Sequence, residues 1–145
     1  PLTLVNGSFK NWQGMTDSGM RQVVKRIYFD VHSIRLLNSE TRQNLTDKNM
    51  VAPEETEGEV VNIGLFRHYI ETYLRKRDDV SKSATLLVRQ LEATQSGVPI
   101  ELYFFIGTTD WVSYEQKTSD ILEHIYAYAN EFGLQIYEGL PVANT

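Results

Sequence analysis

The sequence predicts an α+β domain whose antiparallel sheet carries helices on one face. Two observations lead to this prediction: apolar residues alternate with a period of two in the short segments, and they recur at helical spacing in the longer ones. In chain order the predicted elements are strand, helix, helix, strand, strand, helix and strand. The length of 145 residues, with 41% hydrophobic and 23% charged residues, is typical of one folded domain.

The first predicted strand covers residues 23–31. It follows a polar segment, residues 1–20, that closes with the turn-forming residues Asp17, Ser18 and Gly19. The strand has an apolar side and a polar or aromatic side: Val23, Ile27, Phe29 and Val31 against Arg26, Tyr28 and Asp30. The alternation indicates a half-buried strand.

Two helices are predicted next. The first is short, covers residues 37–45, and has Asn38 or Ser39 as its N-cap. The second is longer and begins after a possible cap at Asn62. It ends in three basic residues, 75–77, which suit the negative end of the helix dipole.

The two apolar runs that follow predict a β-hairpin. They cover residues 85–91 and 99–107, and a short connection that contains a glycine joins them. The second run also has two different sides: Ile100, Leu102, Phe104 and Ile106 on the better apolar face, and Glu101, Tyr103 and Phe105 opposite.

The strongest helix is predicted to begin near Ser113, whose hydroxyl forms an S-x-x-Q capping box with Gln116. Its apolar face extends to Phe132. Gly133 stops the helix, because glycine readily takes the left-handed conformation found at helix ends. Residues 134–137 alternate briefly and are predicted to form the last strand.

One helix can be set aside as an elaboration, which leaves the order βαββαβ, the split-βαβ or ferredoxin-like plan. In this plan helices cover one face of the sheet and the other face is open. We expect Tyr28, Tyr103 and Phe105 side by side on the open face. RNA-recognition domains stack bases on such rings, but Glu101, the net charge of -5 and the lack of a K/R-G-F/Y signature disfavour nucleic acid and favour a protein partner.

Patterns for catalysis or metal binding are not found in the sequence. His32, His68 and His124 lie far apart and outside any metal-ligand spacing. The acidic stretch "PEETEGE" at residues 53–59 lacks the ligand pattern of a calcium loop, so it is predicted to be a solvated loop. No phosphate-binding or nucleophile motif is present. We therefore expect no enzyme activity, no cofactor, no metal and no small-molecule substrate.

The sequence also bears on cellular location. It has no cysteine, which suits a reducing compartment such as the cytoplasm. It has no apolar run of about 18 residues, the least that a membrane helix needs, so this chain by itself is not expected to span a bilayer. Pro1 in place of methionine favours an excised fragment.

Seven stretches carry a resemblance to a known family: "SFKNW", "RQVVKRIYFDVHSIRLL", "GLFRHYIETYL", "TLLVRQL", "QSGVPIELYFF", "TTDWVSYE" and "EFGLQIY". In this order and spacing they resemble the cytoplasmic part of the small-conductance mechanosensitive ion channel (MscS-like) superfamily, closest to its YbdG-like miniconductance branch. The resemblance runs nearly end to end, and its specificity lies in the order of the stretches.

In that family a membrane pore helix leads into a small β domain and then a mixed α/β domain, and seven copies enclose a vestibule under the pore. The resemblance implies that residues 21–145 are the C-terminal α/β domain. Residues 1–20 would be the remnant of the β domain and a linker. The parent would be a homo-heptamer in the bacterial inner membrane, with this fragment on the cytoplasmic side.

The predicted subunit interface has two parts. Phe9 and Trp12 would belong to a sheet and subunit contact that the fragment only partly retains; the alternative is that they fold back on the fragment's own core. Tyr28, Tyr103 and Phe105 would be covered by a neighbouring subunit, because exposed aromatic patches mark interaction surfaces.

The resemblance implies a non-catalytic vestibule domain of a channel that opens under membrane tension during osmotic adaptation. An alternative from another class is a free-standing ligand-sensing or regulatory module on a ferredoxin-like sheet. A small hydrolase would need a phosphate-binding loop that contains an arginine, and no such loop is found in the sequence.

Overall fold

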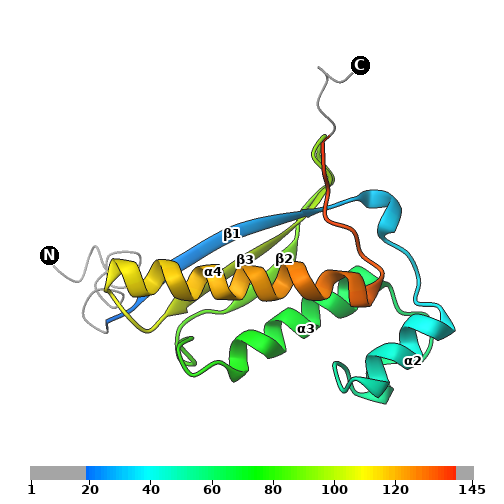
Figure 1. The fold of residues 1–145 in the computed structure, drawn as a ribbon, viewed down its shortest axis with the longest axis horizontal. Coiled ribbons are helices and arrows are strands. Elements are labelled where there is room, and N and C mark those ends of the chain that lie inside the picture. The colour runs from blue at the N-terminus through cyan, green and yellow to red at the C-terminus, as the bar shows by residue number, and fades with distance from the viewer. Residues whose placement is uncertain (1–18, 140–145) are drawn as a thin grey trace, which may run out of the picture.

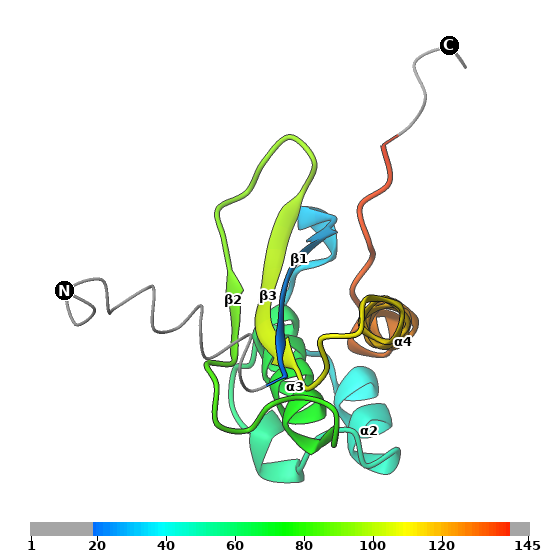
Figure 2. The ribbon, with the colours of Figure 1, turned by 90° about the vertical axis from the view of Figure 1, so that its left-hand side faces the viewer.

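A computed structural model describes residues 19–139 of the chain, which form a three-stranded antiparallel sheet with helices on one side (Figures 1 and 2). The strand order is β1-β3-β2. The strands are β1 (Arg21–Phe29), β2 (Leu87–Gln90) and β3 (Val98–Ile106). The helices are α2 (Ser39–Asp47), α3 (Asn62–Lys76) and α4 (Trp111–Tyr128), with short 3-10 turns at η2 (Val31–Ser33), η3 (Pro53–Thr56) and η4 (Ala129–Phe132). The predicted α+β, ferredoxin-like class is confirmed.

The register of the sheet assigns every strand residue to one of two faces. Strand β1 pairs with β3 from Arg21 opposite Ile106 to Phe29 opposite Val98. Strand β2 pairs with the other edge of β3, starting with Leu87 opposite Tyr103. Directly paired residues share a face of an antiparallel sheet, so the register aligns apolar side chains on the helical side.

The core lies between that face and the helices. Phe66 of α3 is at its centre, with its ring centroid 5.9 Å from Phe29 of β1 and 4.8 Å from Phe132 of η4. All three rings are fully buried. Burial of apolar surface is the main stabilising contribution in such a domain. Further fully buried side chains come from each layer: Ile27, Ile100, Leu102, Phe104, Ile106, Ile70, Leu74, Ile121 and Ile125.

The predicted last strand is wrong as a strand, although its position is right. Residues 134–137 form an isolated bridge, with Ile136 opposite Phe29. The Tyr137 N–H donates to Tyr28 O, and the Asp30 N–H donates to Gln135 O, both at 2.8 Å. Toward Leu134 the pairing cannot extend, because β1 ends at Phe29 and the chain turns into η2. This segment thus lies on the β1 edge, where the ferredoxin-like plan has its fourth strand.

The end of the first strand was also predicted wrongly. Val31 was assigned to the apolar side of a strand, but it lies in η2 with 50% of its surface exposed. The carboxylate of Asp30 accepts a hydrogen bond from the His32 N–H and so caps the turn. This local hydrogen bond competes with the ladder and ends the strand early.

Helices α2 and α4 each begin at a side-chain N-cap, as predicted. In α4 the capping residue differs from the predicted one. Of the two candidates for α2, Asn38 is the N-cap and accepts from the Thr41 N–H at 2.8 Å. The start of α4 lies close to the predicted position near Ser113, but the predicted capping box of Ser113 with Gln116 is wrong. Helix α4 begins at Trp111, because Asp110 accepts from the Ser113 N–H at 2.9 Å.

Gly133 ends the helical segment as predicted, although α4 itself ends at Tyr128 and the last turn is the 3-10 helix η4. Gly133 follows η4 with φ of 74°, a conformation that L side chains rarely adopt. A Cβ at this position would also lie 3.1 Å from the guanidinium of Arg35.

Asn62 does not cap α3 as predicted, but joins three segments from inside the protein. Its side chain is 1% exposed. Its amide oxygen accepts from the Arg35 N–H at 3.0 Å, and its amide nitrogen donates to Ser33 O and Phe132 O, each at 2.9 Å. The segment after β1, the start of α3 and the end of η4 are thereby held together, and the N-cap position belongs to Val61.

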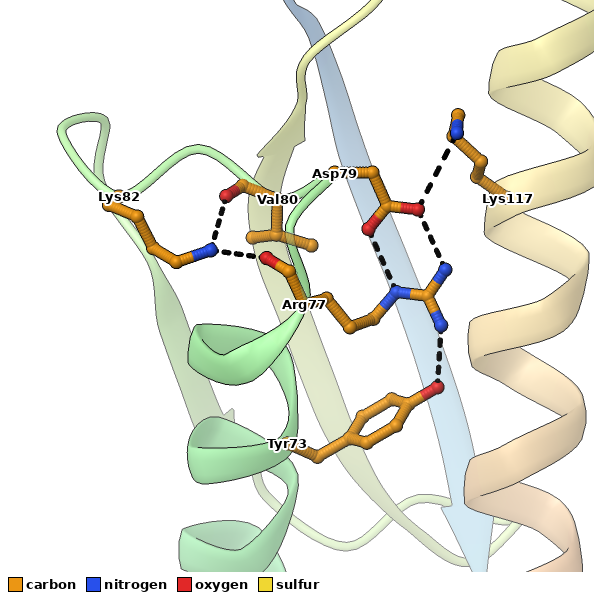
Figure 3. Close-up of polar contacts among 6 residues, drawn as sticks. All are labelled: Tyr73, Arg77, Asp79, Val80, Lys82 and Lys117. Atoms are coloured by element: carbon orange, nitrogen blue, oxygen red, sulfur yellow. Dashed lines mark hydrogen bonds and ion pairs between the residues drawn. The ribbon is translucent and has the colours of Figure 1, made fainter.

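A clamp of charged groups fixes the other end of α3 (Figure 3). The guanidinium of Arg77 donates to both carboxylate oxygens of Asp79, at 2.9 and 2.7 Å, and to the Tyr73 hydroxyl at 2.9 Å. Lys117 of α4 lies 3.6 Å from the same carboxylate, and Lys82 donates to Val80 O at 2.9 Å. The hydrogen bonds from Arg77 hold the pKa of Asp79 below its usual value. The loop that leads from α3 toward β2 is therefore tied to α4.

Replacing Asn62 by alanine should lower the free energy of unfolding by about 2–4 kcal/mol, because it leaves three backbone groups, two in the segment after β1 and one in η4, without partners. Urea unfolding followed by circular dichroism measures this. Asn130→Ala, an exposed position in η4, is the matched control and should change stability little. A loss as small as that of the control would show that the Asn62 amide is not a structural joint.

Candidate functional site: the open face of the sheet

The sheet face that points away from the helices is left without a cover in the described part of the chain. We call it the open face (Figure 2). The register orders its side chains in rows across the strands. It consists of Gln22, Val24, Arg26 and Tyr28 of β1, Pro99, Glu101, Tyr103 and Phe105 of β3, and Leu87 and Arg89 of β2.

One row of the open face is apolar. Tyr103 lies at its centre, between Val24 on one side and Leu87 on the other. Val24 is 45% exposed and Leu87 is 44% exposed, which is high for aliphatic side chains within strands. Phe105 meets Tyr103 edge to face, with the ring centroids 5.8 Å apart. These exposed apolar side chains make the row a candidate interaction surface.

Polar contacts orient the rings of this row. The Gln22 side-chain amide donates to the Tyr103 hydroxyl at 2.8 Å. The hydroxyl of Tyr114 on α4 donates to Gln22 O at 2.6 Å, so a helix supports the end of the row. The apolar row is thus held in one arrangement by the fold.

The neighbouring row consists of an ion triad. The Glu101 carboxylate accepts from Arg26 Nε at 3.0 Å and from Arg89 Nε at 2.8 Å, and Arg89 Nη2 forms an ion pair with it at 2.7 Å. Glu101 is only 6% exposed, because the two guanidinium groups cover it, whereas both arginine side chains are half exposed. The hydrogen bonds from Arg89 and Arg26 lower the pKa of Glu101. The triad carries a net charge of +1.

The structure brings together some of the predicted site residues. Tyr28, Tyr103 and Phe105 all lie on the open face and are partly exposed. Tyr103 and Phe105 are in contact, as expected. Tyr28 pairs with Pro99. It lies four residues along β1 from Val24, the residue opposite Tyr103, and this spacing corresponds to about 13 Å. The triad therefore separates Tyr28 from the other two rings. Phe9 and Trp12 lie outside the described residues.

The triad was missed from the sequence, where Glu101 counted only as an argument against base stacking. The sequence pattern that could reveal the triad is one acidic residue on the outward side of a strand, with an arginine on each of the two flanking strands. The signal becomes readable only when the register is known, because the three residues are far apart in the chain.

The three histidines do not come together. His32 lies 3.3 Å from Asp30, and His68 lies within 4 Å of Glu55 and Glu71. Within residues 19–139 no cluster of metal-ligating side chains is present.

His124 lies between α3 and α4 in a stack of aromatic rings. Its ring is parallel to that of Tyr73, with 3.8 Å between centroids, and its Nε2 is 2.8 Å from the Tyr69 hydroxyl. Burial lowers the pKa of His124 and raises that of Tyr69 to about 12. A neutral imidazole and a neutral phenol at this position suit helix packing.

Two open hollows lie elsewhere on the molecule. One, of about 580 Å³, is bordered by η2 and the segment after η4, with Asp30, Arg35 and Gln135 in its wall. The other, of about 610 Å³, lies among the ends of α2, α3 and α4, with Met50 and Tyr69 in its wall. The open face contributes to neither.

Comparison with known proteins shows a similarity of fold. No family model matches the sequence. The fold is similar to that of a chain in the cryo-EM structure of Arabidopsis thaliana MSL1, an MscS-like channel, with a TM-score of 0.58 and 9% sequence identity. The similarity covers 86% of this chain and 36% of that chain. In the described residues of this protein, none of the helices has the length and apolar character needed to cross a membrane.

Replacing Glu101 by glutamine should lower the free energy of unfolding by about 1–2 kcal/mol at pH 7, because two charge-assisted contacts are lost. The pKa of Glu101 is lower in the folded chain than in the unfolded one, so its contribution is complete above about pH 5 and is lost as the pH falls below about 4. Urea unfolding at pH 7 and at several lower pH values, down to below about 4, measures the difference between the two proteins. It should shrink on acidification, while Glu92→Gln, at an exposed loop position, should show no such difference.

Proposed function

We propose that this chain is the cytoplasmic vestibule domain of a mechanosensitive ion channel that opens under membrane tension during osmotic adaptation. The observation that carries the proposal is the likeness of its fold to part of an MscS-like channel chain. The channel-family resemblance of the sequence supports it from a different direction, since it rests on residue strings and not on coordinates.

In this proposal the domain has a structural role and no catalytic one. It shapes the space through which solutes reach the pore. The parent is an oligomer embedded in a membrane, as a channel requires, with this domain on the cytoplasmic side. The finer assignments are a heptamer, the YbdG-like branch and the bacterial inner membrane, and they rest on the sequence resemblance.

The open face gives the domain a means of contact with its neighbours. Its apolar row and its triad are held rigidly by the register, and rigid aromatic side chains bring large apolar area at low entropic cost. A surface with these properties suits a permanent contact between copies better than it suits a changing set of partners.

The test is a recording of membrane currents under applied tension from cells that express the full-length protein. Tension-gated currents that disappear when the gene is deleted support the proposal. A full-length protein without membrane-spanning helices would overturn it, and would favour the alternative of a free-standing regulatory module. In that case a ligand would be sought at the two hollows.

Replacing Tyr103 by aspartate should weaken the assembly of the full-length protein more than it weakens folding. We expect subunit association to fall at least about tenfold, as for a central aromatic contact, and the free energy of unfolding to fall by about 1–2 kcal/mol. Native mass spectrometry and urea unfolding measure the two effects.

The matched control is Tyr126→Asp, because Tyr126 is a tyrosine that is 46% exposed on α4. It should leave assembly unchanged. Equal losses of assembly and of stability in Tyr103→Asp would mean that the ring serves the core of its own domain and that the open face is not an interface.

A further inference from the structure

We propose that the open face of one copy receives the acidic segment, residues 54–59, of the next copy, with its glutamates on Arg26 and Arg89. The inference rests on the proposed function, since it names the contact between copies that a channel domain needs. It is argued from charge, exposure and position on the two surfaces.

The receiving surface has unused hydrogen-bond donors. A guanidinium carries five N–H groups. Glu101 accepts one hydrogen bond from each guanidinium. Both arginine side chains are half exposed, so an incoming carboxylate can reach them, and the triad has a net charge of +1. An incoming carboxylate would neutralise this charge.

The acidic segment has carboxylates that form no ion pair within the described residues. Glu54, Glu57 and Glu59 are exposed, and none of them forms an ion pair within the described chain. The segment is nevertheless fixed in place. Thr56 is buried, and the Glu55 carboxylate accepts from the Ala52 N–H at 2.9 Å, which shapes η3. Three carboxylates so close in sequence repel one another, and a cationic partner surface relieves this repulsion.

Both surfaces also have an apolar part beside the charged part. Next to the acidic segment, Val61 is 43% exposed and forms an isolated bridge with Leu36, which is 50% exposed. Next to the triad, Val24 and Leu87 flank Tyr103. Contact between the two apolar parts would exclude water from the rim of the ion pairs, which strengthens them.

The two surfaces cannot meet within one copy. The acidic segment joins α2 to α3 on the helical side of the sheet, and the open face points the other way (Figures 1 and 2). The contact is therefore head to tail. In an open row of copies, head-to-tail contacts leave an acidic segment free at one end and an open face free at the other. In a closed ring every acidic segment meets an open face.

Cross-linking between introduced cysteines tests the contact directly, because this chain has no cysteine of its own. The full-length protein is prepared without cysteines and then as two variants, Glu57→Cys and Leu87→Cys. Each variant alone should form no disulfide, and the mixture, assembled together and oxidised, should form a disulfide-linked dimer. Such a bond requires Cα atoms within about 7 Å, so it reports a specific contact.

Charge removal is the second measurement. A triple variant with Glu54, Glu57 and Glu59 each changed to glutamine, and separately Arg89→Gln, should each weaken association by about tenfold or more at low salt. Arg89→Gln can still donate to Glu101, so the sheet keeps its fold. The matched control removes three exposed glutamates elsewhere, Glu92, Glu115 and Glu123, and should leave association unchanged.

Other results would overturn the inference. A Leu87→Cys variant that links to itself would show a face-to-face pair, and a link from Leu87→Cys to Trp12→Cys within one chain would show that the N-terminal segment covers the face. Tension-gated currents without the 57–87 link would reject this contact and leave the proposed function standing. The 57–87 link in a protein without tension-gated currents would support this contact and reject the proposed function.

Discussion

The buried amide of Asn62 is the interaction on which the rest of the fold depends. It satisfies backbone groups of the segment after β1 and of the end of η4, and it does so from the first residue of α3. A buried polar group is stabilising only when all its partners are in place, so the three segments must come together as a unit. That junction ties the segment after β1 to the start of α3 and to the end of η4.

Much of the fold is predictable from the sequence because its signals are local. Period-two and helical patterns predict β1, the hairpin and the long helices, and Gly133 predicts the end of η4. The errors arise where several residues compete for one local role. Asp110 and Ser113 both suit a helix N-cap, and the residue that lies at the true boundary is chosen by the packing of the whole helix. Asn62 looks like a cap because its partners are distant in sequence.

The candidate site is predictable only in part for a similar reason. Alternation along β3 predicts that Tyr103 and Phe105 share the outward side, and the structure confirms this. The distance of Tyr28 from them, and the grouping of Arg26, Glu101 and Arg89, depend on the pairing register of three strands. Register is set by turns and by the core, so it cannot be derived from the spacing of residues within one strand.

The position of the acidic segment connects the inferred contact to that same junction. The segment leads into Val61 and then Asn62, and Val61 bridges to Leu36 beside Arg35, whose N–H binds the Asn62 amide. The chain that follows β1 reaches Ser33, whose backbone oxygen accepts a hydrogen bond from the amide nitrogen of Asn62. If copies meet as we propose, a force between the acidic segment and the open face would pass through the hydrogen bonds of the Asn62 amide. In that arrangement Asn62 would be a short connection between the two contact surfaces of one copy.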